Sequence, residues 1–286
     1  MSAFLALLRF ERAKLTGRAI TWVPFLVLTI VVALIVAVFH RLQFNHMLQL
    51  LRAAFNLGGK DDFVNGYYMA AHAMNPVFQM LIPLFVVVAA GLMVAGEAER
   101  GTLRACLVRP VSRRALILSK FALLTGYALA LCFFLLLLLI GAGILNFGTG
   151  NLYTLNVLFH NGNEGASMIP EAEMPMRLLA AGGLATLGMM VLAALGILVS
   201  ALVDTPAMAF VITLSIYFAC LILRLLPDID WLYPYLFVTH MLRWQQCFFS
   251  YFRTGEILVS TIHLAGYLIA FLSAAVLLFE ERDIKS

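Results

Sequence analysis

The segment Gly96–Lys120 carries the densest set of charged side chains in this sequence, GEAERGTLRACLVRPVSRRALILSK. Two carboxylates, Glu97 and Glu99, are followed by a row of arginines. Helical spacing puts two leucines on one face of a short helix and two arginines on another: Leu103 and Leu107, Arg100 and Arg104. Pro110 ends that helix, and Ser112 is placed to cap the next one. This pattern suits ion pairing and apolar contact with a groove in a partner protein.

No motif for a bound nucleotide or metal occurs in the sequence. A P-loop needs G-x-x-x-x-G-K-[ST]. The only Gly-Lys pair, Gly59-Lys60, is followed by Asp61 and has Ala54 where the first glycine belongs. The six histidines share no metal-ligand spacing. We therefore expect no catalytic residue, cofactor or metal in this chain, and we expect ATP to bind elsewhere.

One enzymatic alternative stays open. Glu171, Glu173 and His160 are the only candidates that could cluster near the outer surface of a membrane. They would belong to an intramembrane enzyme that handles a lipid or an isoprenoid. Their spacing matches no mechanism that we recognise.

The composition indicates a membrane protein. Of 286 residues, 63% are hydrophobic and only 12% are charged, and the mean hydropathy is +0.97. A soluble domain is about 45–50% apolar and about 25% charged. Too few charges remain to cover a water-facing surface, which argues against a soluble enzyme, a disordered regulator and a nucleic-acid-binding module.

Six stretches are long and apolar enough to cross a bilayer, since a spanning helix needs about 20 apolar residues. They are Ile20–Phe39, Val77–Ala95, Leu116–Leu145, Leu178–Leu202, Met208–Leu226 and Ile257–Phe279. The break Val203–Pro206 separates the fourth span from the fifth. The sequence therefore predicts an all-α polytopic membrane protein, with residues 1–286 as one transmembrane domain.

Lysines and arginines set the orientation. If the N-terminus is cytoplasmic, twelve of the 19 Lys and Arg residues lie inside and seven outside. The twelve are Arg9, Arg12, Lys14, Arg18, Arg100, Arg104, Arg109, Arg113, Arg114, Lys120, Arg282 and Lys285. This bias predicts a multi-pass protein of the cytoplasmic (inner) cell membrane with both termini in the cytoplasm.

The N-terminal segment Met1–Arg18 is too charged to cross the membrane. Its apolar residues Phe4, Leu7, Leu8 and Leu15 recur at helical spacing. This favours an interfacial helix on the cytoplasmic surface over a plain basic lead-in to the first span. The charges before the first span and the length of that span argue against a cleaved signal peptide, so we expect the segment to remain.

Two segments resemble the permease subunits of type-2 ATP-binding-cassette (ABC) exporters. In that family, acidic residues precede Gly-Thr-Leu and then a Pro-x-Ser-Arg turn. The matching residues here are Glu97, Glu99, Gly101-Thr102-Leu103, Arg109-Pro110-Val111-Ser112-Arg113 and Lys120. A weaker likeness to the loop before the last span and to the cytoplasmic end covers Tyr235-Leu236-Phe237, Thr239-His240, Trp244, Phe279 and Arg282-Asp283-Ile284.

The resemblance implies a function for the first segment. Residues 97–113 would form a coupling helix that seats in a cleft of a separate ATPase subunit and transmits its closure to the spans. The implied contact residues are Glu97, Glu99, Arg100, Gly101, Thr102, Leu103, Arg104, Leu107, Arg109, Pro110, Ser112 and Arg113. Two ABC ATPase subunits would bind ATP and Mg, and a second permease copy or homologue would complete the complex. Met1–Arg18 would be the elbow helix.

The resemblance also implies an outer gate. Residues 227–256 would form an outer loop whose short re-entrant helices dip into the membrane, with Tyr235, Phe237, His240, Trp244 and Phe248 as gate residues. The alternative for these aromatic residues is an interfacial belt. A scaffold that recruits an ATPase without moving cargo would show the same coupling helix. The substrate is not implied by either segment.

Overall fold

The computed structural model describes residues 2–42, 64–102, 112–155, 166–226, 229–249 and 254–281. Within these ranges, six helices or helical runs are long and apolar enough to cross a membrane: Ala19–Arg41, Gly66–Met93, Arg113–Phe147, Glu171–Leu202, Pro206–Leu223 and Thr254–Glu281. This confirms the predicted all-α polytopic fold. The chain is a multi-pass membrane protein.

The elements follow the chain in this order. Helices α1 (Ser2–Thr16), α2 (Ala19–Leu42), α4 (Gly66–Pro76), η1 (Val77–Leu81), α5 (Ile82–Met93), α6 (Ala95–Glu99) and α8 (Arg113–Phe147) come first. Strands β1 (Leu152–Leu155) and β2 (Ala166–Ile169) and the turn η3 (Glu171–Glu173) follow. The chain continues with α9 (Met174–Leu202), α10 (Pro206–Leu223), η4 (Asp230–Tyr235), α11 (Phe237–Met241), η5 (Leu242–Phe248) and α12 (Thr254–Glu281).

The second span begins 11 residues earlier than the hydropathy pattern predicts, at Gly66 and not at Val77. Polar residues made α4 resemble a loop, but the Asn65 side chain caps this helix and most of its residues are buried. The π-helical turn η1 follows and ends just before Pro83. Because Pro83 has no N–H to donate, the carbonyl of Gln79 four residues earlier lacks its helical partner, and it accepts a hydrogen bond from the Tyr217 hydroxyl at 2.8 Å.

Helix α9 lies at the centre of the bundle. It packs against α12, α5, α8, η5 and α10. In the apolar 18-residue stretch of its span, 72% of the residues are buried. The corresponding share is 17% in each of α2, α10 and α12. The outward faces of those three helices therefore supply the apolar surface that lipid covers.

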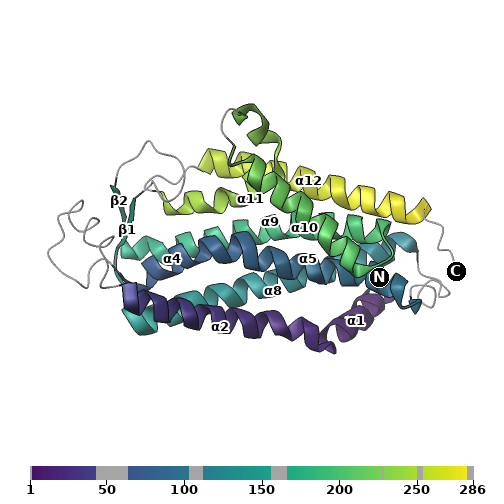
Figure 1. The fold of residues 1–286 in the computed structure, drawn as a ribbon, viewed down its shortest axis with the longest axis horizontal. Coiled ribbons are helices and arrows are strands. Elements are labelled where there is room, and N and C mark those ends of the chain that lie inside the picture. The colour runs from purple at the N-terminus through teal and green to yellow at the C-terminus, as the bar shows by residue number, and fades with distance from the viewer. Residues whose placement is uncertain are drawn as a thin grey trace.

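The two ends of the bundle differ (Figure 1). The start of α8 and the end of α12 lie at the same end as α1, which we call the α1 end. The strands β1 and β2 lie at the opposite end, the hairpin end. They pair antiparallel, with Leu152 opposite Ile169. This small sheet was not predicted, since the loop between the third and fourth spans carries no strong strand pattern.

Helices α4 and α8 cross at backbone contact through Gly66 and Gly143. A Cβ added to Gly143 would lie 2.7 Å from the carbonyl oxygen of Gly66. A Cβ on Gly66 would lie 2.4 Å from the carbonyl carbon of Gly143. Because both obstacles are backbone atoms, neither helix has room for a side chain at this crossing.

We expect Gly143→Ala to lower the free energy of unfolding by about 1–3 kcal/mol, because it overpacks this crossing. The matched control is Gly141→Ala on the same helix, where a new Cβ meets no atom within 4 Å. Thermal denaturation of the purified protein in detergent checks both variants. An equal loss of melting temperature in the control would show that the crossing is not the cause.

Candidate functional site

The short helix α6 is fixed to the centre of the bundle. The Ser200 hydroxyl of α9 accepts a hydrogen bond from the N–H of Ala95 at 2.9 Å and donates to the carbonyl of Gly91 at 3.1 Å. Ser200 is fully buried. This double contact sets the direction in which α6 leaves α5 and turns Glu97 into the protein.

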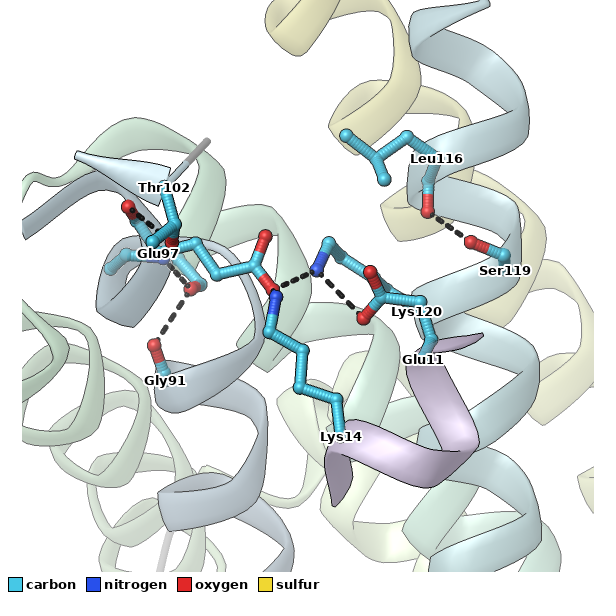
Figure 2. Close-up of polar contacts among 10 residues, drawn as sticks. Glu11, Lys14, Gly91, Glu97, Thr102, Leu116, Ser119 and Lys120 are labelled. Atoms are coloured by element: carbon cyan, nitrogen blue, oxygen red, sulfur yellow. Dashed lines mark hydrogen bonds and ion pairs between the residues drawn. The ribbon is translucent and has the colours of Figure 1, made fainter. Parts of the chain in front are cut away.

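Glu97 belongs to a buried charge cluster of four residues, Glu11, Lys14, Glu97 and Lys120 (Figure 2). The Lys120 ammonium lies 2.8 Å from Oε1 of Glu97 and 3.2 Å from Oε2 of Glu11. The Lys14 ammonium reaches the same Glu97 oxygen at 2.5 Å. Three helices, α1, α6 and α8, are thereby joined at the α1 end.

The cluster is internally neutral, with two carboxylates and two ammonium groups. The side chain of Lys120 is 0% exposed, and those of Glu11 and Glu97 are each 3% exposed. A buried ammonium of this kind is tolerated only when it is paired and hydrogen-bonded. The second oxygens, Oε1 of Glu11 and Oε2 of Glu97, have no hydrogen-bond partner among the described residues.

The electrostatics favour an ionised Glu97. Burial by itself raises the pKa of the Glu97 carboxyl, but Lys120 and Lys14 outweigh burial and hold that pKa below its ordinary value of 4.5. The two lysines therefore keep the carboxylate charged down to acidic pH.

The resemblance implies that Glu97 contacts a partner, but in the structure its carboxylate points inward to the two lysines. Acidic residues in a loop between spans are usually at the surface, so sequence pattern alone could not reveal this. Lys120 carried a usable signal. It is the only Lys, Arg, Asp or Glu in the predicted span Leu116–Leu145, where a charged residue normally needs a partner.

Four other residues of the coupling segment 97–113 lie on the surface. Glu99, Arg100, Gly101 and Thr102 are exposed. Gly101 has a φ of 68°, a left-handed conformation that stops α6 and favours glycine. Leu103, Arg104, Leu107, Arg109 and Pro110 lie outside the described residues.

The far end of the coupling segment is anchored as well. Ser112 caps α8, as its position predicts, by accepting a hydrogen bond from the N–H of Ala115 at 3.3 Å. The Arg113 guanidinium donates to the carbonyls of Phe279 and Glu280, at 3.3 and 2.9 Å. These carbonyls belong to the last turn of α12, where a cation is favoured. Arg113 therefore ties the start of α8 to the end of α12.

The predicted gate residues do not form one group. Trp244 and Phe248 are buried and contact each other edge-on, with ring centroids 6.2 Å apart, and Trp244 also contacts Phe78. Phe237 packs elsewhere, against Tyr267 and Phe271 of α12. His240 bonds to Ser260 and stacks on His263. Tyr235 is 71% exposed.

Among the residues of the enzymatic alternative, Glu173 pairs with an arginine of the same helical run. Glu173 accepts two hydrogen bonds from Arg177, at 3.0 and 2.8 Å. Arg177 also donates to the carbonyls of Cys247 and Phe249, so this pair holds the end of η5 against α9. His160 lies outside the described residues. Within the part of the chain that the structure describes, no three His, Cys, Asp or Glu side chains are grouped to hold a metal.

We expect Lys120→Met to lower the free energy of unfolding by about 3–5 kcal/mol, because it leaves buried carboxylates without a full complement of positive charge. The triple variant Glu11→Gln, Glu97→Gln, Lys120→Met should recover much of that loss. The matched control is Arg114→Met, which removes an exposed pair with Glu280 and should change little. The measurement is the melting temperature of each variant in detergent. A melting temperature of Lys120→Met equal to that of the wild type would contradict the stabilising role of the cluster.

The cluster also predicts a dependence of stability on pH. The folded pKa of Glu97 lies below its unfolded value, so its stabilising contribution is complete above about pH 5 and is lost as pH falls through the folded pKa. The melting temperatures of the wild type and of Glu97→Gln should therefore differ at pH 7 and converge towards pH 3. A constant difference across this range would show that Glu97 is not ionised in the folded protein.

Comparison with known proteins places the chain in a family. Over 83 residues it is 35% identical to the "Uncharacterized protein YhcI" of Bacillus subtilis (strain 168). That match spans 28% of this chain and 26% of the relative's length. A family model described as "Protein of unknown function (DUF2705)" matches residues 23–285, nearly the whole chain. The chain therefore belongs to the DUF2705 family.

Proposed function

We propose that this chain is the membrane-spanning permease subunit of an ABC exporter, working as a dimer and driven by separate ATPase subunits. One observation carries the proposal. The coupling segment 97–113 has an exposed stretch, Glu99–Thr102, next to an end that is tightly anchored in the bundle. Such an arrangement suits a segment that is pulled or pushed by a partner.

The anchors at the two ends of the segment favour transmission of movement. A displacement of the segment acts on α1 and α8 through the charge cluster at Glu97. It acts on α12 through Arg113. Because paired charges and helix-end contacts resist stretching, the helices would move with the segment and not independently of it. ATP-driven closure of two partner subunits could rock the permease halves by this route.

The charge distribution supports a cytoplasmic location for the α1 end. Arg9, Arg12, Lys14 and Arg18 lie in or beside α1, and Arg113 and Arg114 lie at the start of α8. Basic residues close to the ends of spans favour the cytoplasmic side. We accordingly propose a protein of the cytoplasmic (inner) cell membrane with both termini in the cytoplasm.

The packing supports a pathway between two copies. The central helix α9 is surrounded by five other helical elements, and side chains fill the space around it. A cavity that carries cargo is therefore better placed between two permease copies than within one. The sequence has no P-loop, so ATP and Mg would be bound by the ATPase subunits.

We expect the double variant Arg100→Glu, Leu103→Asp to release the ATPase or uncouple its hydrolysis while the permease still inserts. Arg100 is exposed, and Leu103 lies on the apolar face that helical spacing predicts for the segment. The amount of ATPase that co-purifies from native membranes should fall at least about tenfold, the change that a loss of about 1.4 kcal/mol produces. Arg9→Glu, an exposed charge reversal on α1, is the matched control.

Two results would count against the proposal. A wild-type protein that never retains a P-loop ATPase would contradict the ABC assignment. A double variant with unchanged binding and hydrolysis would show that the segment is not the contact. ATP hydrolysis that is not stimulated by any exported substrate would favour a scaffold that recruits an ATPase without moving cargo.

A further inference from the structure

A cavity of about 750 Å³ with both polar and apolar lining opens where the fifth span ends and the sixth begins, between the end of α10, the segments η4 and α11, and the first turns of α12. We propose that this cavity binds the phosphate group of an anionic amphiphile, such as a phospholipid, with the apolar tail lying outside it. The inference does not rest on the proposed transport function.

Two arginines and two carboxylates, Asp230 and Glu256, line the cavity, but only one of the arginines has an ion pair among the described residues. Arg243 pairs with Glu256 at 2.9 Å. Its Nε is buried without a hydrogen-bond partner. Arg224 is half-buried and has no carboxylate within 4.0 Å among the described residues, although Asp230 also lines the cavity. Arg243 is close enough to act on Arg224 as a like charge. An added anion would relieve this repulsion.

A neutral donor is also left over. Thr239 lines the cavity and is 7% exposed, and its hydroxyl has no partner among the described residues. A buried hydroxyl without a partner is costly, so its presence beside two arginines points to a ligand acceptor. Guanidinium and hydroxyl donors together match the oxygens of a phosphate.

The histidines of the cavity are already committed to the protein. Nε2 of His240 lies 2.9 Å from the carbonyl of Pro234, which can only accept, so this nitrogen carries the proton. Nδ1 then accepts from the Ser260 hydroxyl at 3.2 Å. Nδ1 of His263 likewise donates to the carbonyl of Val259 at 2.8 Å. Among the described cavity residues, the unused donors therefore include Arg224, Nε of Arg243 and Thr239.

The rim of the cavity indicates an amphiphile and not a free ion. Leu225, Leu226 and Val259 line it and are 68%, 45% and 52% exposed. The cavity also lies where α10 ends at Leu223 and α12 begins at Thr254. Helix ends of spans lie at the level of lipid headgroups. A headgroup in the cavity would leave its acyl chains against the apolar outward faces of α10 and α12.

The test is equilibrium binding to the full-length protein in neutral detergent. The probes are short-chain phosphatidylglycerol, short-chain diacylglycerol and inorganic phosphate. We expect saturable binding of phosphatidylglycerol, with diacylglycerol and inorganic phosphate each at least about tenfold weaker, since each supplies only half of the recognised chemistry. Diacylglycerol that binds as tightly as phosphatidylglycerol would overturn the phosphate assignment. Inorganic phosphate that binds as tightly would overturn the amphiphile.

Variants locate the binding. Arg224→Gln should weaken phosphatidylglycerol binding about tenfold or more. The matched control is Arg41→Gln, an exposed arginine at the end of α2 outside the cavity, which should leave binding unchanged. Equal effects of the two variants would show general surface attraction and overturn the site.

A second variant guards against misfolding of Arg224→Gln. Thr239→Val keeps the shape of the side chain and removes the unpartnered hydroxyl. It should weaken phosphatidylglycerol binding without lowering the melting temperature, because no protein contact is lost. If Thr239→Val binds phosphatidylglycerol as tightly as the wild type, the Thr239 hydroxyl does not contact the ligand. This result would overturn the proposed set of donors.

Discussion

The pairing of Lys120 is the constraint on which the α1 end of the molecule depends. A lysine without solvent exposure needs carboxylates beside it, and the two that pair with Lys120 come from α1 and α6. Helix α1 is therefore held against the bundle by charge as well as by apolar contact. The buried hydroxyl of Ser200 sets the direction of α6. This direction brings Glu97 to Lys120 and so allows the two side chains to pair. The cluster thus fixes both the interfacial helix and the beginning of the coupling segment.

Helix α8 connects this constraint to the rest of the fold. Its first residue holds the end of α12, its eighth residue is the buried lysine, and its far end crosses α4 at the Gly66–Gly143 contact. A tilt of α8 would therefore disturb contacts at both ends of the bundle. Helix α9 at the centre limits such movement further, since it packs against most of the other spans. If a partner moves the coupling segment, as we propose, these contacts favour a rotation of the whole bundle over a bend of one helix.

The sequence predicted the features that depend on length and apolar content. It did not predict features that depend on contacts between residues distant in the sequence. Five of the six spans begin and end within about four residues of the predicted limits, because crossing a bilayer sets the length of an apolar run. The start at Gly66 was missed because α4 buries polar residues against other helices. The inward direction of Glu97 depends on Lys14 and Lys120, which are distant in the sequence. The outer gate stays a prediction from the resemblance, and in the structure Phe237 and Trp244 pack against different neighbours.

The charge cluster at the α1 end and the arginines of the cavity differ in how their charges are paired. The difference distinguishes a structural role from a binding role. In the cluster at the α1 end, each ammonium group faces a carboxylate and the sum of the charges is zero. Such a site is balanced in charge without a ligand, although one oxygen of each carboxylate has no hydrogen-bond partner among the described residues, and it fixes the positions of three helices. In the cavity beside α10 and α12, Arg224 has no ion pair among the described residues, and two further donors are left without acceptors. Leaving donors unpaired costs stability in the free protein. That cost is offset only when an acceptor arrives, so the second arrangement has the character of a binding site and the first that of a structural joint.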